Sequence, residues 1–147
     1  MSLSECTLLN TPSMNDFIEF GVYDAKVLKV YDGDTIWVAY NNKKLGIIKA
    51  KVRFNRINAA EIKKRKGQIE NEEQKKERLV KAHAAREFVD RVIGGEIIKI
   101  NITSIDTQYD RLLADILVTP KQLKVNSTDN YIDLSNFMLQ GGLVEKY

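Results

Sequence analysis

The chain has 147 residues, 44% of them hydrophobic and 29% charged, which is enough to bury the core of one domain. No apolar run approaches the roughly 20 residues of a membrane-spanning helix, and the N-terminal residues lack the basic flank and apolar stretch of a secretory signal. The single cysteine, Cys6, excludes an internal disulfide and a cysteine-based zinc site. We therefore expect no membrane partner and mildly favour an intracellular location. The net charge of +3 permits a polyanionic partner but does not identify one.

Residues 1–20 show no lasting hydrophobic period, so we predict a flexible N-terminal arm there. Residues 21–147 form one predicted domain, without an internal repeat or a linker. The domain opens with three predicted strands that follow one another closely, at 22–30, 34–40 and 45–57. Asp32-Gly33 is a strong turn signal between the first two strands.

A long helix is predicted after the third strand. It should begin near Asn71, where Glu72 and Glu73 suit the positive end of the helix dipole, and end at Gly94-Gly95. Apolar residues at helical spacing predict its buried stripe: Leu79, Ala82, Ala85, Phe88 or Val89, and Val92. Two further strands, 96–103 and 112–118, precede a short helix that Asp133 caps and Gly141-Gly142 ends.

This order of elements predicts a fold that is mainly β with helices. Five strands, with one long helix after the third and a short C-terminal helix, indicate a five-stranded OB-fold barrel. Such barrels often bind oligonucleotides, but a fold alone does not assign a function. The function has to be sought in individual side chains.

Two residues of the first three strands are candidates for chemistry. Asp34 follows a tight turn, and calcium needs several oxygen ligands of this kind. The alternative, favoured for this turn taken alone, is a plain hairpin with Asp34 facing water. Arg53 interrupts an apolar strand, where it must pair with an acid or reach an open cleft. Its guanidinium can hold a phosphate through two parallel hydrogen bonds.

Two more candidates lie after the third strand and between the last two. Glu61 could position or deprotonate a water, although a lone glutamate in a loop is more often solvated. Arg111 could stabilise a developing phosphoryl charge, or it could pair locally with Asp106 or Asp110. Each residue is ambiguous by itself.

The combination is more specific than its parts. Asp32-Gly33-Asp34-Thr35, Val-Arg53-Phe, Asn58-Ala-Ala-Glu61 and Tyr109-Asp-Arg111 occur in one order, each in the expected secondary structure. Together with the closing segment 138–143, they resemble the staphylococcal nuclease (thermonuclease-like) family over roughly residues 22–144. That family has an OB-type barrel and hydrolyses DNA and RNA with calcium. The resemblance therefore implies a phosphodiesterase that acts on DNA and/or RNA, with Ca²⁺ as its cofactor.

The resemblance also implies a metal site. Asp34 would be a direct calcium ligand, with Asp32 and Thr35 as supporting residues. Asn58 stands where the family normally has a second carboxylate ligand, and the neighbouring ligand would be the backbone carbonyl of Ala59. Because an amide oxygen coordinates calcium without carrying a charge, we expect weaker metal binding.

The catalytic roles follow from the same resemblance. Glu61 would hold the attacking water, either as general base or as a water-orienting group. Arg53 and Arg111 would clamp the scissile phosphate. Apart from the resemblance, Tyr109 and Trp37 could both contact the substrate by stacking on bases, as aromatic side chains do in single-strand grooves. For Trp37 the alternative, a place in the core, is favoured by its strand neighbours.

Three other positions depart from the family pattern. Ala60 replaces the usual proline before the glutamate, Gln108 stands where a lysine is often seen, and Asp110 stands where glycine is common. The last two changes make the phosphate neighbourhood less positive. They leave two alternatives open, a non-catalytic nucleic-acid-binding module and a protein-interaction barrel. The basic run 63–66 could contact a nucleic-acid backbone, but a solvated loop is the commoner case. Nothing indicates an oligomer, so a monomer is favoured.

Overall fold

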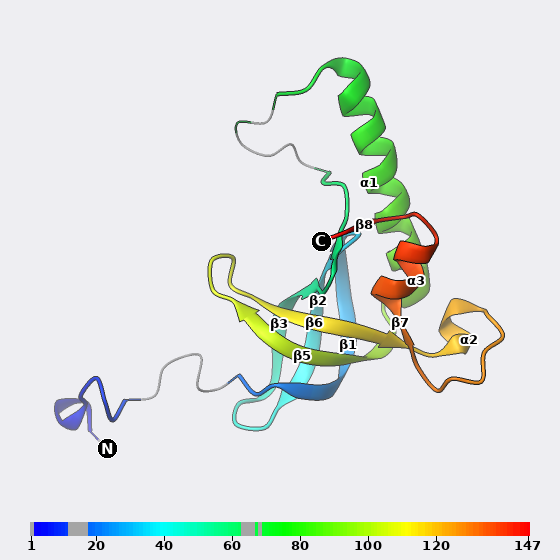
Figure 1. Ribbon diagram of the computed structural model, residues 1–147. Helices are drawn as coiled ribbons and strands as arrows, with labels where there is room; N and C mark the ends of the chain where they lie inside the picture. The colour runs from blue at the N-terminus through cyan, green and yellow to red at the C-terminus, as the bar shows by residue number, and fades with distance from the viewer. Residues whose placement is uncertain (1, 12–17, 63–66, 68) are drawn as a thin grey trace.

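A closed barrel of five strands is the centre of the computed structural model, which describes residues 2–11, 18–62, 67 and 69–147 (Figure 1). The strands run in the order β3-β2-β1-β5-β6, and a parallel pairing of β3 with β6 closes the sheet. Their bounds are β1 (Gly21–Asp32), β2 (Thr35–Asn42), β3 (Gly46–Phe54), β5 (Ile97–Asp106) and β6 (Arg111–Val118). The predicted fold class is confirmed, and the barrel is consistent with OB-fold families.

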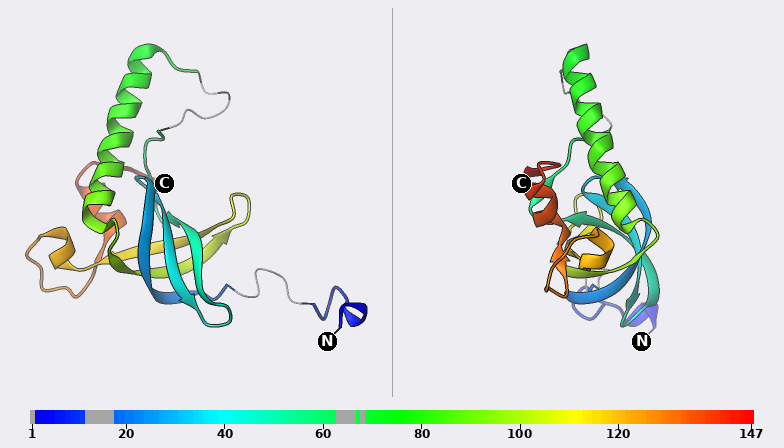
Figure 2. Two further views of the ribbon diagram at one scale, coloured as in Figure 1. Left: turned by 180° about the vertical axis from the view of Figure 1, so that it is seen from behind. Right: turned by 90° about the vertical axis from the view of Figure 1, so that its right-hand side faces the viewer.

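Two of the helices follow the sequence prediction. The long helix α1 (Glu72–Ile93) begins at Asn71, whose side chain accepts a hydrogen bond from the Gln74 backbone in a capping box. The short helix α3 (Leu134–Gln140) begins at Asp133, whose side chain accepts from the Asn136 backbone. Both helices lie against the same end of the barrel, as two further views show (Figure 2).

Several short elements were not predicted. They are a 3-10 helix (Leu3–Glu5), β4 (Ile57–Asn58), α2 (Pro120–Leu123), β7 (Ile132–Asp133) and β8 (Glu145–Lys146). The strand β7 extends the sheet beside β6, and β8 pairs with β4 near the C-terminus. The pairing of β4 with β8 brings residues 145–147 back to the barrel.

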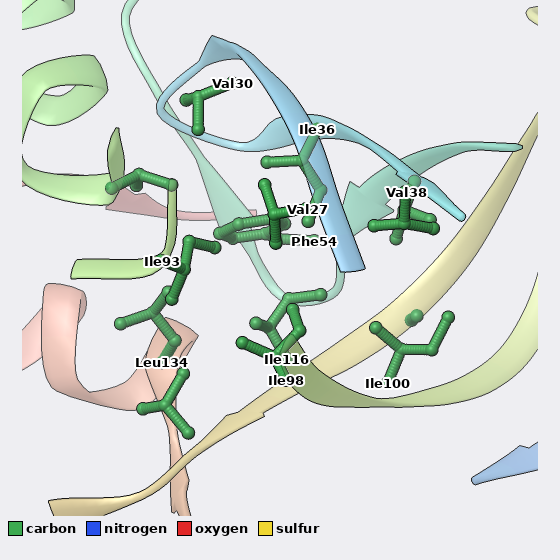
Figure 3. Packing of buried hydrophobic residues seen from close by; sticks show 14 of the residues in the cluster. Val27, Val30, Ile36, Val38, Phe54, Ile93, Ile98, Ile100, Ile116 and Leu134 are labelled. Carbon is green, nitrogen blue, oxygen red and sulfur yellow. The ribbon is translucent and has the colours of Figure 1, made fainter. Parts of the chain in front are cut away.

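The core lies inside the barrel and under the two helices. Side chains such as Ile36, Phe54 and Ile116 point into the barrel and are almost fully buried (Figure 3). Ile93 of α1 and Leu134 of α3 close the end of this cluster. Full burial of each large apolar side chain stabilises the fold by about 1.5–3 kcal/mol. The end of the barrel under the two helices is therefore a stable part of the fold.

Two sequence predictions about the strands were wrong. The predicted third strand, 45–57, is interrupted after Phe54, because Arg56 adopts a positive φ of 70° that breaks the ladder before β4. Trp37 was expected in the core, but it is only half-buried and lies on the outer face of the barrel. The cause is the two-residue period of a strand: Ile36 and Val38 point inward, so Trp37 between them must point outward.

No helix in the described ranges is long and apolar enough to cross a membrane. The basic run 63–66, for which a nucleic-acid contact was considered, lies outside the described residues. The segment that bears Glu61 is described up to residue 62 and links β4 with that run.

Candidate functional site

An open cleft of about 910 Å³ lies where the β1–β2 turn, β3, the segment after β4 and the β5–β6 turn meet. Its lining includes eight of the nine candidate site residues: Asp32, Asp34, Thr35, Arg53, Asn58, Glu61, Tyr109 and Arg111. The ninth, Ala59, donates its backbone N–H to Asp34 and so lies directly beside the cleft. The structure therefore gathers residues from four separate parts of the chain around one opening.

The β1–β2 turn is packed tightly against its surroundings. A Cβ added at Gly33 would lie 2.6 Å from the Ala85 Cβ of α1 and 2.9 Å from the Ala59 Cβ. Glycine is thus required here by close approach. The turn therefore passes closely between α1 and the segment after β4 at Gly33, the residue just before Asp34.

Asp34 is buried, with 6% of its surface exposed, so the alternative of a hairpin acid facing water does not hold. Its Oδ1 accepts a hydrogen bond from the Thr35 hydroxyl at 2.8 Å. Its Oδ2 accepts from the Ala59 N–H at 2.9 Å and lies 3.6 Å from Arg53 Nη1. These contacts hold the carboxylate in one orientation at the floor of the cleft.

Asp32 is a second carboxyl group beside the first. Burial, followed by a side-chain hydrogen bond with Asp34 and the charge of that neighbour, raises the pKa of Asp32 to about 7. The backbone N–H of Asp34, which donates to Asp32 Oδ1 at 3.1 Å, and the charge of Arg53 act in the opposite direction but do not compensate. Two carboxyl groups therefore lie together in a desolvated site, and the positive charge of Arg53 does not fully balance their negative charge.

Arg53 holds the local backbone as well as facing the cleft. Its Nη1 donates to the carbonyls of Phe54 and Ile57 at 3.0 and 2.9 Å, and its Nη2 donates to Asn58 Oδ1 at 2.9 Å. These bonds use three of the five N–H groups of a guanidinium. Arg53 thus fixes the break between β3 and β4, and two of its N–H groups have no hydrogen-bond acceptor among the described residues.

Tyr147 was missed by the sequence analysis although it lines the cleft. Its ring centroid lies 5.5 Å from the Arg53 guanidinium carbon, and its backbone N–H donates to the Arg56 carbonyl at 3.0 Å. No sequence signal marks a terminal tyrosine as part of a site. Only the pairing of β8 with β4 brings it there.

Glu61 is held in place through its backbone. Arg78 of α1 donates to the carbonyls of Glu61 and Ile62, the latter at 2.9 Å. A salt bridge of 2.9 Å to Glu70 orients Arg78, whose pKa this hydrogen bond raises. Arg78 is a second residue that the sequence analysis missed, because a charged residue on an amphipathic helix ordinarily faces water.

Arg111 and Tyr109 line the cleft from the turn between β5 and β6 and the start of β6. Arg111 Nε donates to Asp106 Oδ2 at 2.9 Å, which is the main cause of a lowered pKa of Asp106. The Arg111 guanidinium carbon lies 5.0 Å from the Tyr109 ring, and 59% of Tyr109 is exposed. Asp110, where the family resemblance expects glycine, has a φ of 52°, a conformation that aspartate adopts more readily than most residues.

The cleft offers oxygen atoms, the ligand type that a hard cation prefers, but only two carboxylates among them would carry negative charge. Asp32 and Asp34 supply carboxylates whose mutual repulsion a cation would remove. The amide oxygen of Asn58 is already bonded to Arg53. Among the described residues, no group of three or more His, Cys, Asp or Glu side chains is arranged to hold a metal ion. Calcium at this position would thus depend on two carboxylates plus neutral oxygens.

A scan against protein-family models gives no match, and a search of curated proteins finds none. The interpretation of the cleft therefore depends on its own residues.

Proposed function

We propose that the protein is a calcium-dependent nuclease of the staphylococcal nuclease type, which hydrolyses phosphodiester bonds of DNA and/or RNA. One observation supports this more than any other. A buried, oriented Asp34, two arginines and Glu61 line the same cleft. Cleavage of a phosphodiester requires a group that handles the proton of water and cations that balance the phosphate charge, and these residue types supply both.

In this proposal each group of residues in the cleft would have a separate role in the reaction. The two Arg53 N–H groups not used in the bonds described above, and the guanidinium of Arg111, would bind the non-bridging phosphate oxygens. The water oxygen would form a bond to phosphorus while its proton passes to the Glu61 carboxylate, and the bond from phosphorus to the leaving oxygen would break. Asp34, Asn58 and the Ala59 backbone carbonyl would hold calcium, with Asp32 as a supporting carboxylate; calcium when bound supplies positive charge to the phosphate and lowers the pKa of water.

Substitution of Glu61 tests this proposal. The Glu61→Gln variant keeps the shape of the side chain but cannot accept a proton, so cleavage of single-stranded DNA or RNA should slow by about 10²–10⁴-fold. Glu87→Gln, at an exposed position of α1, is the matched control and should cut at the wild-type rate. The proposal fails if wild-type protein with millimolar calcium cuts neither polymer.

A specific contact favours a second candidate, a non-catalytic nucleic-acid-binding module. Arg53 Nη2 donates a hydrogen bond to Asn58 Oδ1, the oxygen expected to bind calcium. This bond occupies the oxygen and uses one N–H group of the arginine within the protein. Such a module would bind polynucleotides with a clear salt dependence and show no cleavage that calcium stimulates.

A further inference from the structure

The outer face of the β1–β2–β3 meander carries aromatic and cationic side chains together. Trp37 of β2 has Lys29 of β1 and Lys51 of β3 as its direct cross-strand neighbours. Lys49 Nζ lies 5.6 Å and Lys51 Nζ 5.7 Å from the Trp37 ring centroid, and Lys51 Nζ is also 5.5 Å from the Tyr31 ring. Lys51 is thus held between two rings by cation–π contacts.

These residues lead to the cleft. Tyr31 and Lys51 are part of its lining, next to Arg53. Lys49, Lys51 and Arg53 alternate along β3, so all three point outward and recur about every 6.6 Å. We call Tyr31, Trp37, Lys49 and Lys51 the cationic track.

The positive charge of this face is not neutralised by neighbours. Within the described ranges, neither Lys49 nor Lys51 lies within 4.0 Å of a carboxylate oxygen in an ion pair, and the same holds for Lys29. Asp24, on the outer face of β1, is bound by Lys99 of β5 at 2.8 Å. The ammonium groups therefore remain available to an anionic ligand, while the rings hold their side chains in place.

We propose that the cationic track binds a single strand of nucleic acid and leads it into the cleft. This inference rests on the proposed function, in that the cleft accepts a phosphate of the same strand. Phosphates would follow Lys49, Lys51 and Arg53 along β3, and unstacked bases would contact Tyr31 and the open parts of Trp37. A duplex keeps its bases stacked within the helix, so it would gain only the phosphate contacts.

The test compares two double variants. Lys49→Gln/Lys51→Gln removes two charges from the track and keeps most of each side chain. Lys121→Gln/Lys124→Gln removes two exposed charges at α2, on the other side of the barrel from β3. Binding of a fluorescently labelled 20-nucleotide single strand is measured by anisotropy without calcium over a series of salt concentrations. Circular dichroism confirms that both variants are folded.

The track variant should bind the 20-mer about tenfold more weakly at 0.1 M salt, and the slope of log affinity against log salt should fall by about 1.4. The α2 variant should bind like wild type. Trp37 is the only tryptophan, so its fluorescence should change when the wild-type protein binds the strand. Equal binding by the two variants, or equally tight binding of a matched duplex, would overturn the proposal.

The same variants separate this proposal from the proposed function. Because binding is measured without calcium, an inactive enzyme still gives a result for the track. If the protein is active, the ratio of kcat/KM for the 20-mer to that for a dinucleotide should fall about tenfold in the track variant. An unchanged ratio in an active enzyme would refute the track and leave the nuclease proposal intact.

Discussion

Replacing Asn58 by aspartate adds one negative charge to the cleft at a well-defined position. Asn58 Oδ1 lies 2.9 Å from Arg53 Nη2, and Asp34 Oδ2 lies 3.6 Å from Nη1 of the same arginine. A carboxylate about 4 Å from a divalent cation, with full water screening, contributes roughly 2 kcal/mol of attraction. That corresponds to about 30-fold tighter binding of calcium. The new charge also strengthens the bond to Arg53, so the fold should be preserved.

The assay is a calcium titration of both binding and cleavage for wild type and Asn58→Asp. The calcium concentration at half-maximal cleavage should fall by about 10–100-fold in the variant. Asn126→Asp, at an exposed position after α2, adds the same charge away from the cleft and should leave the titration unchanged. If a folded Asn58→Asp protein titrates like wild type, Asn58 is not a metal ligand and the assignment of the cleft oxygens is wrong.

Three other predictions concern the groups that shape the cleft. Arg53→Lys keeps the charge, but one ammonium cannot span both the carbonyls that Nη1 bonds and the Asn58 oxygen that Nη2 bonds. Urea unfolding should therefore show a loss of about 1–3 kcal/mol, and cleavage should fall as the fork to the phosphate is lost. Asp32 has a folded-state pKa raised from 3.8 to about 7. Relative to Asp32→Asn, the wild-type free energy of unfolding should therefore fall by roughly 1–3 kcal/mol as pH rises from 4 to 8 without calcium; parallel pH curves would refute this. Gly33→Ala, whose Cβ would meet Ala85 at 2.6 Å, should destabilise the fold by about 1–3 kcal/mol in the same assay, and wild-type stability would contradict the close packing.

The main elements of the fold could be predicted from the sequence because their signals are local. The cap at Asn71, the glycines after α1 and the alternation of Ile36 and Val38 each act within a few residues. The interruption between β3 and β4 could not be predicted from such local signals. It depends on Arg56 in a left-handed conformation and on Arg53, which holds the carbonyls on both sides of the break.

The candidate site, too, could be predicted from the sequence only in part. The gathering of Asp34, Arg53 and Glu61 followed from a resemblance spread over separate motifs, and their chemical roles remain predictions. Arg78 and Tyr147 were missed because their contacts depend on tertiary packing. Arg78 reaches the backbone of the Glu61 segment from the side of a helix, and Tyr147 reaches Arg53 only through the β4–β8 pairing.

Calcium dependence of the cleavage of a short single-stranded substrate tests the central claim most directly. We predict no cleavage in excess chelator, cleavage that rises with calcium to a plateau, and a loss of about 10²–10⁴-fold in Glu61→Gln at that plateau. Absence of cleavage at every calcium concentration would contradict the proposal, as would a rate that chelator does not change.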